Sequence, residues 1–301
     1  MSSARTYNSV VLVKQVPDTH NITGNVMKND GTLNRSALPA IFNPEDLNAL
    51  EMALQVRERY GGQVTVMTMG PPQAAEVLRD ALHRGADRVI LLSDRKFAGA
   101  DTLATSYALT GAIKKLGDYD LVFCGRQAID GDTAQVGPQT AEKLGIPQIT
   151  YAESIVSLDG DEIVAERALP LGKELVQCSL PCLLTVVASA NQPRPPSARK
   201  RIEYKLAATP LEYRSLLKKW PEFENEDVLD AYLTKRDLKL PLWTTADLDV
   251  DEEKLGLSGS PTQVYKVNFV VLESTQSKEI PANQEGIAAL LQELVQEYIV
   301  G

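Results

Sequence analysis

Short apolar runs and longer amphipathic segments alternate through the first half of the chain. The apolar runs are rich in Val, Ile and Leu, and they cover residues 9–16, 63–69, 88–92 and 119–124. They are continuous, whereas a strand with one face in water alternates apolar and polar positions. Continuous runs are typical of parallel strands that helices cover on both faces. The pattern therefore predicts a parallel sheet.

Helices are predicted between these strands, at residues 43–60, 72–83 and 101–115. The first begins at Asn43, a common N-cap residue, which a proline and two acids follow. Paired glycines end this helix, Gly85 closes the second, and Asp101 can cap the third. The order β-α-β-α-β-α-β predicts an α/β fold with a doubly wound, mostly parallel sheet.

The pattern changes after Pro147. Two short apolar runs flank a glycine-containing turn, which predicts an antiparallel hairpin over residues 154–165. Residues 175–178 and 182–188 predict two further strands. The proline-rich sequence NQPRPP at residues 191–196 indicates that the chain leaves the sheet there.

The remaining residues predict an addition to the sheet domain. Residues 205–248 are mixed, and residues 284–298 predict an amphipathic helix with the apolar stripe Ile287, Leu290, Leu291, Leu294, Val295 and Tyr298. This helix can pack on its own domain or on a partner chain, and the sequence leaves both open. We divide the chain into a nucleotide-binding domain, residues 1–192, and a partner-contacting insert with a C-terminal arm, residues 193–301.

Composition and charge exclude several classes of function. The chain has 301 residues, 44% of them hydrophobic, which is enough for one large domain or two smaller ones. A net charge of -9 argues against a general nucleic-acid binder, because such a protein needs a basic face. We expect no signal peptide and no membrane span, since the longest apolar stretches have only strand length.

The few cysteines favour a cytoplasmic protein with ordinary buried thiols over a disulfide framework. There are 3 cysteines and 2 histidines. Cys178 and Cys182 lie close in sequence, yet a zinc site there would find few other ligands, and we predict no metal site.

The segment GRQAIDGDTAQVGP at residues 125–138 carries the candidate chemistry. Its glycines let the backbone turn tightly and approach a ligand. Asp132 or Thr133 can cap a helix that runs to Leu144, and free amides at a helix start bind anions. The segment also follows a central strand, where open α/β sheets bind ligands. A tight turn without a ligand is the alternative.

Two acids limit how this loop can bind a phosphate. Asp130 and Asp132 would repel a pyrophosphate if both faced it. We expect their carboxylates to accept from backbone amides, a ribose hydroxyl or an adenine amine, while main-chain amides hold the phosphates. Neither G-x-G-x-x-G nor the P-loop G-x-x-x-x-G-K is present. Residues 13–19, 68–72 and 99–102 are expected at the same sheet edge, so a common pocket can form.

These segments together resemble the electron transfer flavoprotein β family. The motifs VKQVPDT, NPEDLNALE, MGPPQA, ALHRGADR, FAGADTLATS and GRQAIDGDTAQVGPQ occur in this order within residues 9–190, and LGLSGSPT follows at residues 255–262. Each motif alone is weak, but their combination in one chain is specific.

The resemblance implies a Rossmann-like, adenine-nucleotide-binding sheet in a heterodimer whose α subunit carries its own FAD. In the ordinary branch of the family, the β subunit holds a structural AMP. In the electron-bifurcating branch, FAD replaces AMP, with its ADP part in the same pocket and its ring facing an NADH site. The fuller motifs of this chain are more similar to the bifurcating branch.

That branch implies a division of electrons between two acceptors. NADH reduces the β-subunit FAD, and one electron passes to ferredoxin or flavodoxin. The other passes through the α-subunit FAD to an acyl-CoA dehydrogenase or similar flavoenzyme. The protein binds, orients and tunes the flavin, so we name no catalytic acid, base or nucleophile. NADH-oxidising activity is expected only of the α/β complex.

The resemblance also implies which residues contact the cofactor. The adenylate contacts match Leu12, the range Asn43 to Asp46, Met69, and the loop residues Gly125, Arg126, Gln127, Ala128, Ile129, Asp130, Gly131, Asp132, Thr133, Ala134, Gln135 and Val136. Thr102 and Thr105 align with threonines near the flavin, so the ring is expected beside them and beside Ala100 and Asp101.

The chain departs from the family at two places. Ordinary members have a leucine that anchors partner dehydrogenases, where this chain has Ala198 beside a basic run. Residues 205–240 are also longer than usual, and the aromatic residues Trp220, Phe223, Tyr232 and Trp243 suit either a packed insert or a partner contact.

Two other classes of function share this type of fold. A nucleotide-binding signalling or structural module would form a homodimer without flavin. An ATP-pyrophosphatase-type enzyme is disfavoured, because no S-G-G-x-D-S loop follows the first strand.

Overall fold

A computed structural model describes residues 5–18, 39–262 and 278–297 of the chain. The chain forms two compact units, Met1–Val264 and Tyr265–Gly301. The described part of the second unit contains helix α8, Gln284–Gln296. The division that we predicted at residue 192 is a different boundary and stays a prediction.

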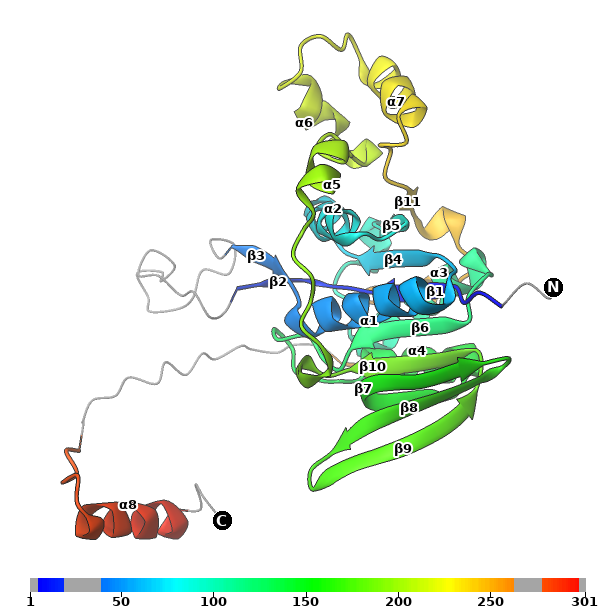
Figure 1. The fold of residues 1–301 in the computed structure, drawn as a ribbon. Coiled ribbons are helices and arrows are strands. Elements are labelled where there is room, and N and C mark those ends of the chain that lie inside the picture. Colours follow the sequence, from blue (N-terminus) through cyan, green and yellow to red (C-terminus); the bar gives the residue numbers. More distant parts are fainter. Residues whose placement is uncertain (1–4, 19–38, 263–277, 298–301) are drawn as a thin grey trace. The chain divides into compact units, whose positions relative to one another are not determined.

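The first unit is built on a nine-stranded sheet in the order β11-β5-β4-β1-β6-β10-β7-β8-β9 (Figure 1). Neighbours from β11 to β7 are parallel, whereas β8 is antiparallel to both β7 and β9. The strands are β1 Ser9–Leu12, β4 Val64–Met69, β5 Arg88–Leu92, β6 Leu121–Gly125, β7 Gln148–Asp159, β8 Glu162–Leu169, β9 Gly172–Ser179, β10 Cys182–Val186 and β11 Leu242–Trp243. The predicted fold class, a mostly parallel α/β sheet with an antiparallel addition, is confirmed.

Strand β1 lies near the middle of this order. The chain passes from β1 to β4 and β5 on one side, and then crosses to β6 on the other side. The carboxyl ends of β1 and β6 therefore form the switch point, where open α/β sheets bind their ligands.

Helices cover both faces of the sheet (Figure 1). Helices α1, Pro44–Tyr60, and α2, Ala75–Arg84, pack with Val11 of β1 on one face. Helices α3, Thr102–Leu116, and α4, Val136–Leu144, pack with Val10 on the other face. Because both faces are covered, adjacent residues of β1 are both fully buried, and the strand is a continuous apolar run.

Short 3₁₀ segments make several of the connections. They are η3 Pro72–Ala74, η4 Arg95–Phe97, η5 Ala188–Ala190, η6 Pro210–Glu212, η7 Thr245–Asp247 and η8 Glu252–Lys254. The first of these leads directly into α2, so the helix predicted at residues 72–83 is confirmed with a tighter first turn.

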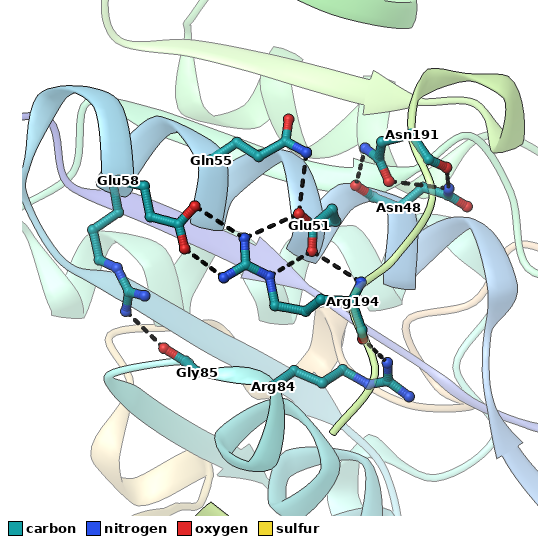
Figure 2. A network of polar contacts seen from close by, with 9 residues as sticks. Asn48, Glu51, Gln55, Glu58, Arg84, Gly85, Asn191 and Arg194 are labelled. Atoms are coloured by element: carbon teal, nitrogen blue, oxygen red, sulfur yellow. Dashed lines mark hydrogen bonds and ion pairs between the residues drawn. The ribbon is translucent and has the colours of Figure 1, made fainter. Parts of the chain in front are cut away.

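After β10 the chain crosses α1 as an extended strap, residues 191–197, which charged and amide side chains hold in place (Figure 2). Arg194 Nε lies 2.7 Å from Oε2 of Glu51, and Arg194 Nη2 lies 3.2 Å from Oε2 of Glu58. Asn48 Nδ2 donates to the carbonyl of Asn191 at 2.7 Å. Burial opposes ionisation of Glu51, but the hydrogen bonds from Arg194 hold the pKa of this carboxyl below its usual range.

A helical insert follows the strap. It contains α5 Ala198–Glu203, α6 Tyr213–Leu217 and α7 Glu226–Lys235. Leu229 and Leu233 are fully buried, and the aromatic rings of Trp220, Phe223 and Tyr232 pack against the same core. The chain leaves the sheet at residues 191–196 as predicted, but it returns as β11 beside β5, which the sequence did not indicate.

The prediction of one strand over residues 9–16 is wrong. Strand β1 ends at Leu12, and β2, Gln15–Pro17, pairs antiparallel with β3, Ala40–Phe42, in a separate sheet. The break occurs because the amide of Lys14 donates to a carboxylate of α1, at 2.8 Å, and not to a neighbouring strand.

The predicted start of α4 is also wrong. Neither Asp132 nor Thr133 caps this helix, because Asp132 and Ala134 have left-handed backbone conformations, with φ of 48° and 52°. The chain therefore turns twice before the helix begins, and Gln135 occupies the N-cap position.

Candidate functional site

Three strands end at one edge of the sheet, and the predicted site residues lie there. Leu12, Met69 and Gly125 are the last residues of β1, β4 and β6. The register places Leu12 opposite Met67 on one side and Cys124 on the other. The expected convergence of these segments on a common edge is thus present.

Asp46 ties two of these strand ends together. Its Oδ2 accepts from the amide of Lys14 at 2.8 Å, and its Oδ1 accepts from the amide of Gly125 at 2.9 Å. Burial raises the pKa of this carboxyl to about 7, against the opposing effect of both hydrogen bonds. A Cβ at position 125 would lie 2.5 Å from Asp46 Oδ1, so only glycine allows this approach.

Asn43 and Glu45, at the start of α1, hold the loop that follows β6. Asn43 is fully buried, and its side chain accepts from the amide of Ile129 at 3.1 Å and donates to the carbonyl of Gln127 at 2.9 Å. Asn43 is the N-cap residue as predicted, but its side chain makes no capping bond within α1. Glu45 Oε2 accepts from the amide of Gln127 at 3.1 Å. Hydrogen bonds from the start of α1 therefore fix the conformation of residues 126–129.

The two loop acids have side-chain partners. Lys14 Nζ lies 2.7 Å and 2.9 Å from the two carboxylate oxygens of Asp130, and Gln127 Nε2 donates to Asp132 at 2.8 Å. We expected backbone amides, ribose or adenine as their partners, and the structure shows a lysine and a glutamine in those roles. The charge of Asp130 is therefore compensated within the protein, and Asp132 accepts a hydrogen bond from a neutral amide.

The N-terminus of α4 is open. Gln135 makes no side-chain cap, and no amide from Thr133 to Gly137 has an acceptor among the residues that the structure describes. Such amides at the positive end of a helix dipole bind anions. Gly137 is required in this first turn, because a Cβ there would lie 2.7 Å from Cys124 Sγ.

The N-terminus of α3 is closed. Asp101 Oδ1 accepts from the amides of Leu103 and Ala104 at 2.9 Å and 3.0 Å, which confirms the predicted cap. Its Oδ2 accepts from the amide and hydroxyl of Thr262 at 3.1 Å and 2.7 Å. The amide of Asp101 donates to Ser260 Oγ at 2.8 Å, so the LGLSGSPT segment lies against this helix start.

The two helix starts touch each other. Thr102 Oγ1 donates to Gln135 Oε1 at 2.8 Å. This bond joins a residue predicted near the flavin ring to a residue predicted to contact the adenylate. Ala100 directly precedes the cap of α3, and Thr105 lies in its first turn, where its amide donates to the carbonyl of Asp101. All predicted site residues are therefore at one sheet edge.

Two residues at this edge, Lys14 and Tyr151, were missing from the predicted site, whereas Glu45 lies within the predicted range Asn43 to Asp46. Lys14 neutralises Asp130, Glu45 holds Gln127, and Tyr151 lies against the guanidinium of Arg126 at 5.7 Å. Lys14 lies within the matched motif VKQVPDT, which was a usable signal. Tyr151 gave none, since it lies between Pro147 and the hairpin predicted at residues 154–165, where the sequence predicted no element.

Metal and thiol chemistry have little support in the described residues. They contain no cluster of three or more possible metal ligands. Cys124 and Cys182 are buried and Cys178 is partly buried, as predicted for ordinary thiols, and burial raises the pKa of each. No helix in the described part of the chain has the length and hydropathy of a membrane span.

Comparison with known proteins decides the family. Residues 30–210 match the electron transfer flavoprotein domain. The chain is 47% identical over 257 residues to the electron transfer flavoprotein subunit beta of Thermoanaerobacterium thermosaccharolyticum, which covers 85% of this chain and 86% of that protein. This chain belongs to the electron transfer flavoprotein β-subunit family.

Two further relatives have names that refer to larger complexes. One is the caffeyl-CoA reductase-Etf complex subunit CarD of Acetobacterium woodii, 42% identical over 258 residues, or 85% of this chain and 86% of that protein. The other is the acryloyl-CoA reductase electron transfer subunit gamma of Anaerotignum propionicum, 39% identical over 295 residues, or 96% and 98%. Electron transfer flavoprotein β subunits pair with an α subunit, and this chain is therefore one half of such a complex.

Proposed function

We propose that the switch-point edge binds the ADP part of FAD, and that this β subunit takes part in electron bifurcation from NADH. The proposal rests mainly on the start of α4, which has no side-chain cap and lies beside a loop that α1 holds by hydrogen bonds. A phosphate at this position would receive amides that otherwise lack an acceptor.

The acids at the edge have hydrogen-bond partners within the protein. Lys14 already compensates Asp130, and Gln127 engages Asp132, so neither carboxylate needs to face a phosphate. Asp46 is buried, and its two carboxylate oxygens accept hydrogen bonds from two backbone amides. The adenylate would be held by residues 125–136 with Leu12 and Met69 at the strand ends.

The choice of FAD over AMP rests on the motifs and on the relatives. The segments FAGADT and GLSGSPT, which resemble the bifurcating branch, meet at Asp101 and Thr262. Two relatives are named for complexes with CoA-ester reductases. When bound, FAD supplies the redox chemistry, because it takes up a hydride from NADH and releases electrons singly. Thr102 and Thr105 are the residues that we propose to lie near its ring.

The proposed electron acceptors are ferredoxin or flavodoxin and, through the α-subunit FAD, an acyl-CoA dehydrogenase-like flavoenzyme. We also propose a cytoplasmic location. For the α subunit, we propose that α8 makes part of the contact, since Ile287, Leu291 and Val295 are each more than half exposed on one stripe. Deleting residues 281–301 should weaken the heterodimer on gel filtration, and an unchanged complex would count against this contact.

Cofactor analysis of the chain purified with its α partner tests the proposal. We expect FAD in both subunits, no AMP, and loss of flavin absorbance when NADH is added without oxygen. One FAD per heterodimer together with AMP, and no response to NADH, would show an ordinary electron carrier. That alternative uses the same adenylate pocket, so the site geometry suits both.

A further inference from the structure

Tyr151 has a backbone conformation that tyrosine rarely adopts. Its φ is 58°, in the left-handed region. Among the described residues, the other non-glycine residues with positive φ are Asp132, Ala134 and Asp237. Aspartate tolerates this region, whereas a bulky aromatic residue there is strained. Strain of this kind persists only where surrounding contacts enforce it, and it concentrates at functional sites.

A β-bulge places this residue. Strand β7 pairs with β10 at Ile149 and again at Ala152, with one fewer residue on the β10 side, so Thr150 and Tyr151 together oppose Thr185. The amide of Tyr151 donates to Thr185 Oγ1 at 3.1 Å. Glycine is the usual occupant of a left-handed bulge position, and bulges redirect side chains next to active sites. A tyrosine here therefore indicates a use for its side chain.

The side chain of Tyr151 lies against Arg126, the first residue of the nucleotide loop. The guanidinium carbon is 5.7 Å from the ring centroid, within the range of a cation–π contact. Glu45 holds the same guanidinium, with Nη2 3.1 Å from Oε1 and Nε 3.3 Å from Oε2. The backbone of Arg126 is also fixed, because its amide donates to Val186 at 2.9 Å. Tyr151 itself is 41% exposed, so burial of its ring does not explain the strain.

We propose that Tyr151 is a positioning residue for the nucleotide loop, which fixes the Arg126 guanidinium between its ring and Glu45 so that residues 126–135 are preorganised for an adenylate. This inference rests on the proposed function of the edge. It predicts that the bulge lowers stability of the fold and improves nucleotide affinity.

The test compares strain relief at two positions in the heterodimer. Tyr151→Gly removes both the strain and the ring, and Asp237→Gly removes strain at a position outside the site. AMP, added to nucleotide-free heterodimer, is the probe, because both candidate cofactors contain it. We expect Tyr151→Gly to unfold at the same or a higher temperature and to bind AMP about three- to tenfold more weakly. Asp237→Gly should bind AMP as the wild type does.

Two further variants test whether Tyr151 affects AMP binding through the guanidinium of Arg126. Tyr151→Phe keeps the ring and should restore wild-type affinity. Arg126→Ala should weaken AMP binding, and the double variant with Tyr151→Gly should lose no more than Arg126→Ala alone, since both residues act through one guanidinium. If Tyr151→Gly does not fold, Tyr151→Asn replaces it, because asparagine tolerates the left-handed region.

Equal AMP affinity of Tyr151→Gly and the wild type would overturn the inference. So would additive losses in the double variant, or a fall in unfolding temperature that Tyr151→Phe also shows, because these results indicate a packing role. If the wild type itself binds neither AMP nor FAD, the proposed function fails first, and the two failures are distinguishable.

Discussion

Helices α3 and α4 begin side by side at the same sheet edge, joined by the hydrogen bond from Thr102 to Gln135, yet their N-termini differ. Asp101 closes the start of α3 with bonds to two helix amides and to Thr262. The start of α4 has no side-chain cap. Both helices have the same kind of dipole, so the caps alone decide which positive end remains for an anion.

The difference has a cost in the absence of a ligand. A side-chain cap stabilises a helix by about 1 kcal/mol, and α4 forgoes it. The sequence can supply such a cap, as Asp101 shows at the neighbouring helix. The uncapped start of α4 at the switch point fits the anion site that we propose, and the first turn of α1 supports it by holding the loop.

Removal of Asp46 should break this arrangement most strongly. Asp46→Ala leaves the amides of Lys14 and Gly125 without an acceptor at the junction of β1 and β6. We expect the free energy of unfolding to fall by about 2–4 kcal/mol, measured by urea denaturation. Glu76→Ala, an exposed surface control, should change it little. A loss as small as that of the control would show that the junction does not depend on this carboxylate.

The same residue gives a pH dependence of definite sign. Burial raises the pKa of Asp46 from 3.8 to about 7. Between these pH values the folded state binds more protons than the unfolded state, so the stability due to Asp46 is complete below about pH 4 and is lost as the pH rises through 7.

Asp46→Asn isolates this effect, because it lacks the titrating group. The stability difference between the wild type and this variant should shrink from pH 4 to pH 8 in parallel urea titrations. A difference that grows with pH would mean that the hydrogen bonds outweigh burial and lower the pKa.

Removing the cap of α3 should have the next smaller effect on the free energy of unfolding. Asp101→Ala should cost about 1–2 kcal/mol in unfolding free energy, because it removes the cap and the bonds to Thr262. Thr262→Val removes only the hydroxyl bond to Asp101 and keeps the amide bond, so the loss in unfolding free energy should be smaller. We expect AMP affinity to stay unchanged in both variants, by calorimetry on the heterodimer. A loss of AMP affinity as large as that of loop variants would show that both helix starts face the adenylate.

A change of Gln135 at the start of α4 should have the smallest effect on stability and a clear effect on AMP binding. Gln135→Asp should change the free energy of unfolding by less than about 1 kcal/mol, because Pro138 offers no amide for a cap, and the added charge should weaken AMP binding roughly tenfold. Gln135→Asn has the size of aspartate without its charge, and so isolates the effect of repulsion. Thr102→Val controls for the lost bond to Gln135. Stronger AMP binding by Gln135→Asp would contradict an anion site at α4.

Local patterns predicted what depends on local contacts. The run containing Val10 and Val11 indicated a strand covered on both faces, and both residues are fully buried there. Asp101 indicated the cap of α3, and its carboxylate makes that cap. The motifs identified the edge and most of the residues that meet there.

Distant contacts account for what the sequence did not predict. Strand β1 stops because Asp46, on another element, takes the amide of Lys14. The start of α4 is displaced because Asp132 turns into the left-handed region and its carboxylate accepts from Gln127. The bulge at Tyr151 depends on register with β10, which no local pattern encodes.

The helical insert has a consequence for how this protein can change over evolution. The ends of its larger part, residues 209–237, meet, since the amide of Ala208 donates to Leu238 at 3.0 Å and the amide of Leu240 donates to Ala208 at 2.9 Å. A segment whose ends are already joined can be lengthened, shortened or exchanged without moving the strands that flank it. New surface can thus arise within residues 209–237 while the edge formed by the ends of β1, β4 and β6 keeps its geometry.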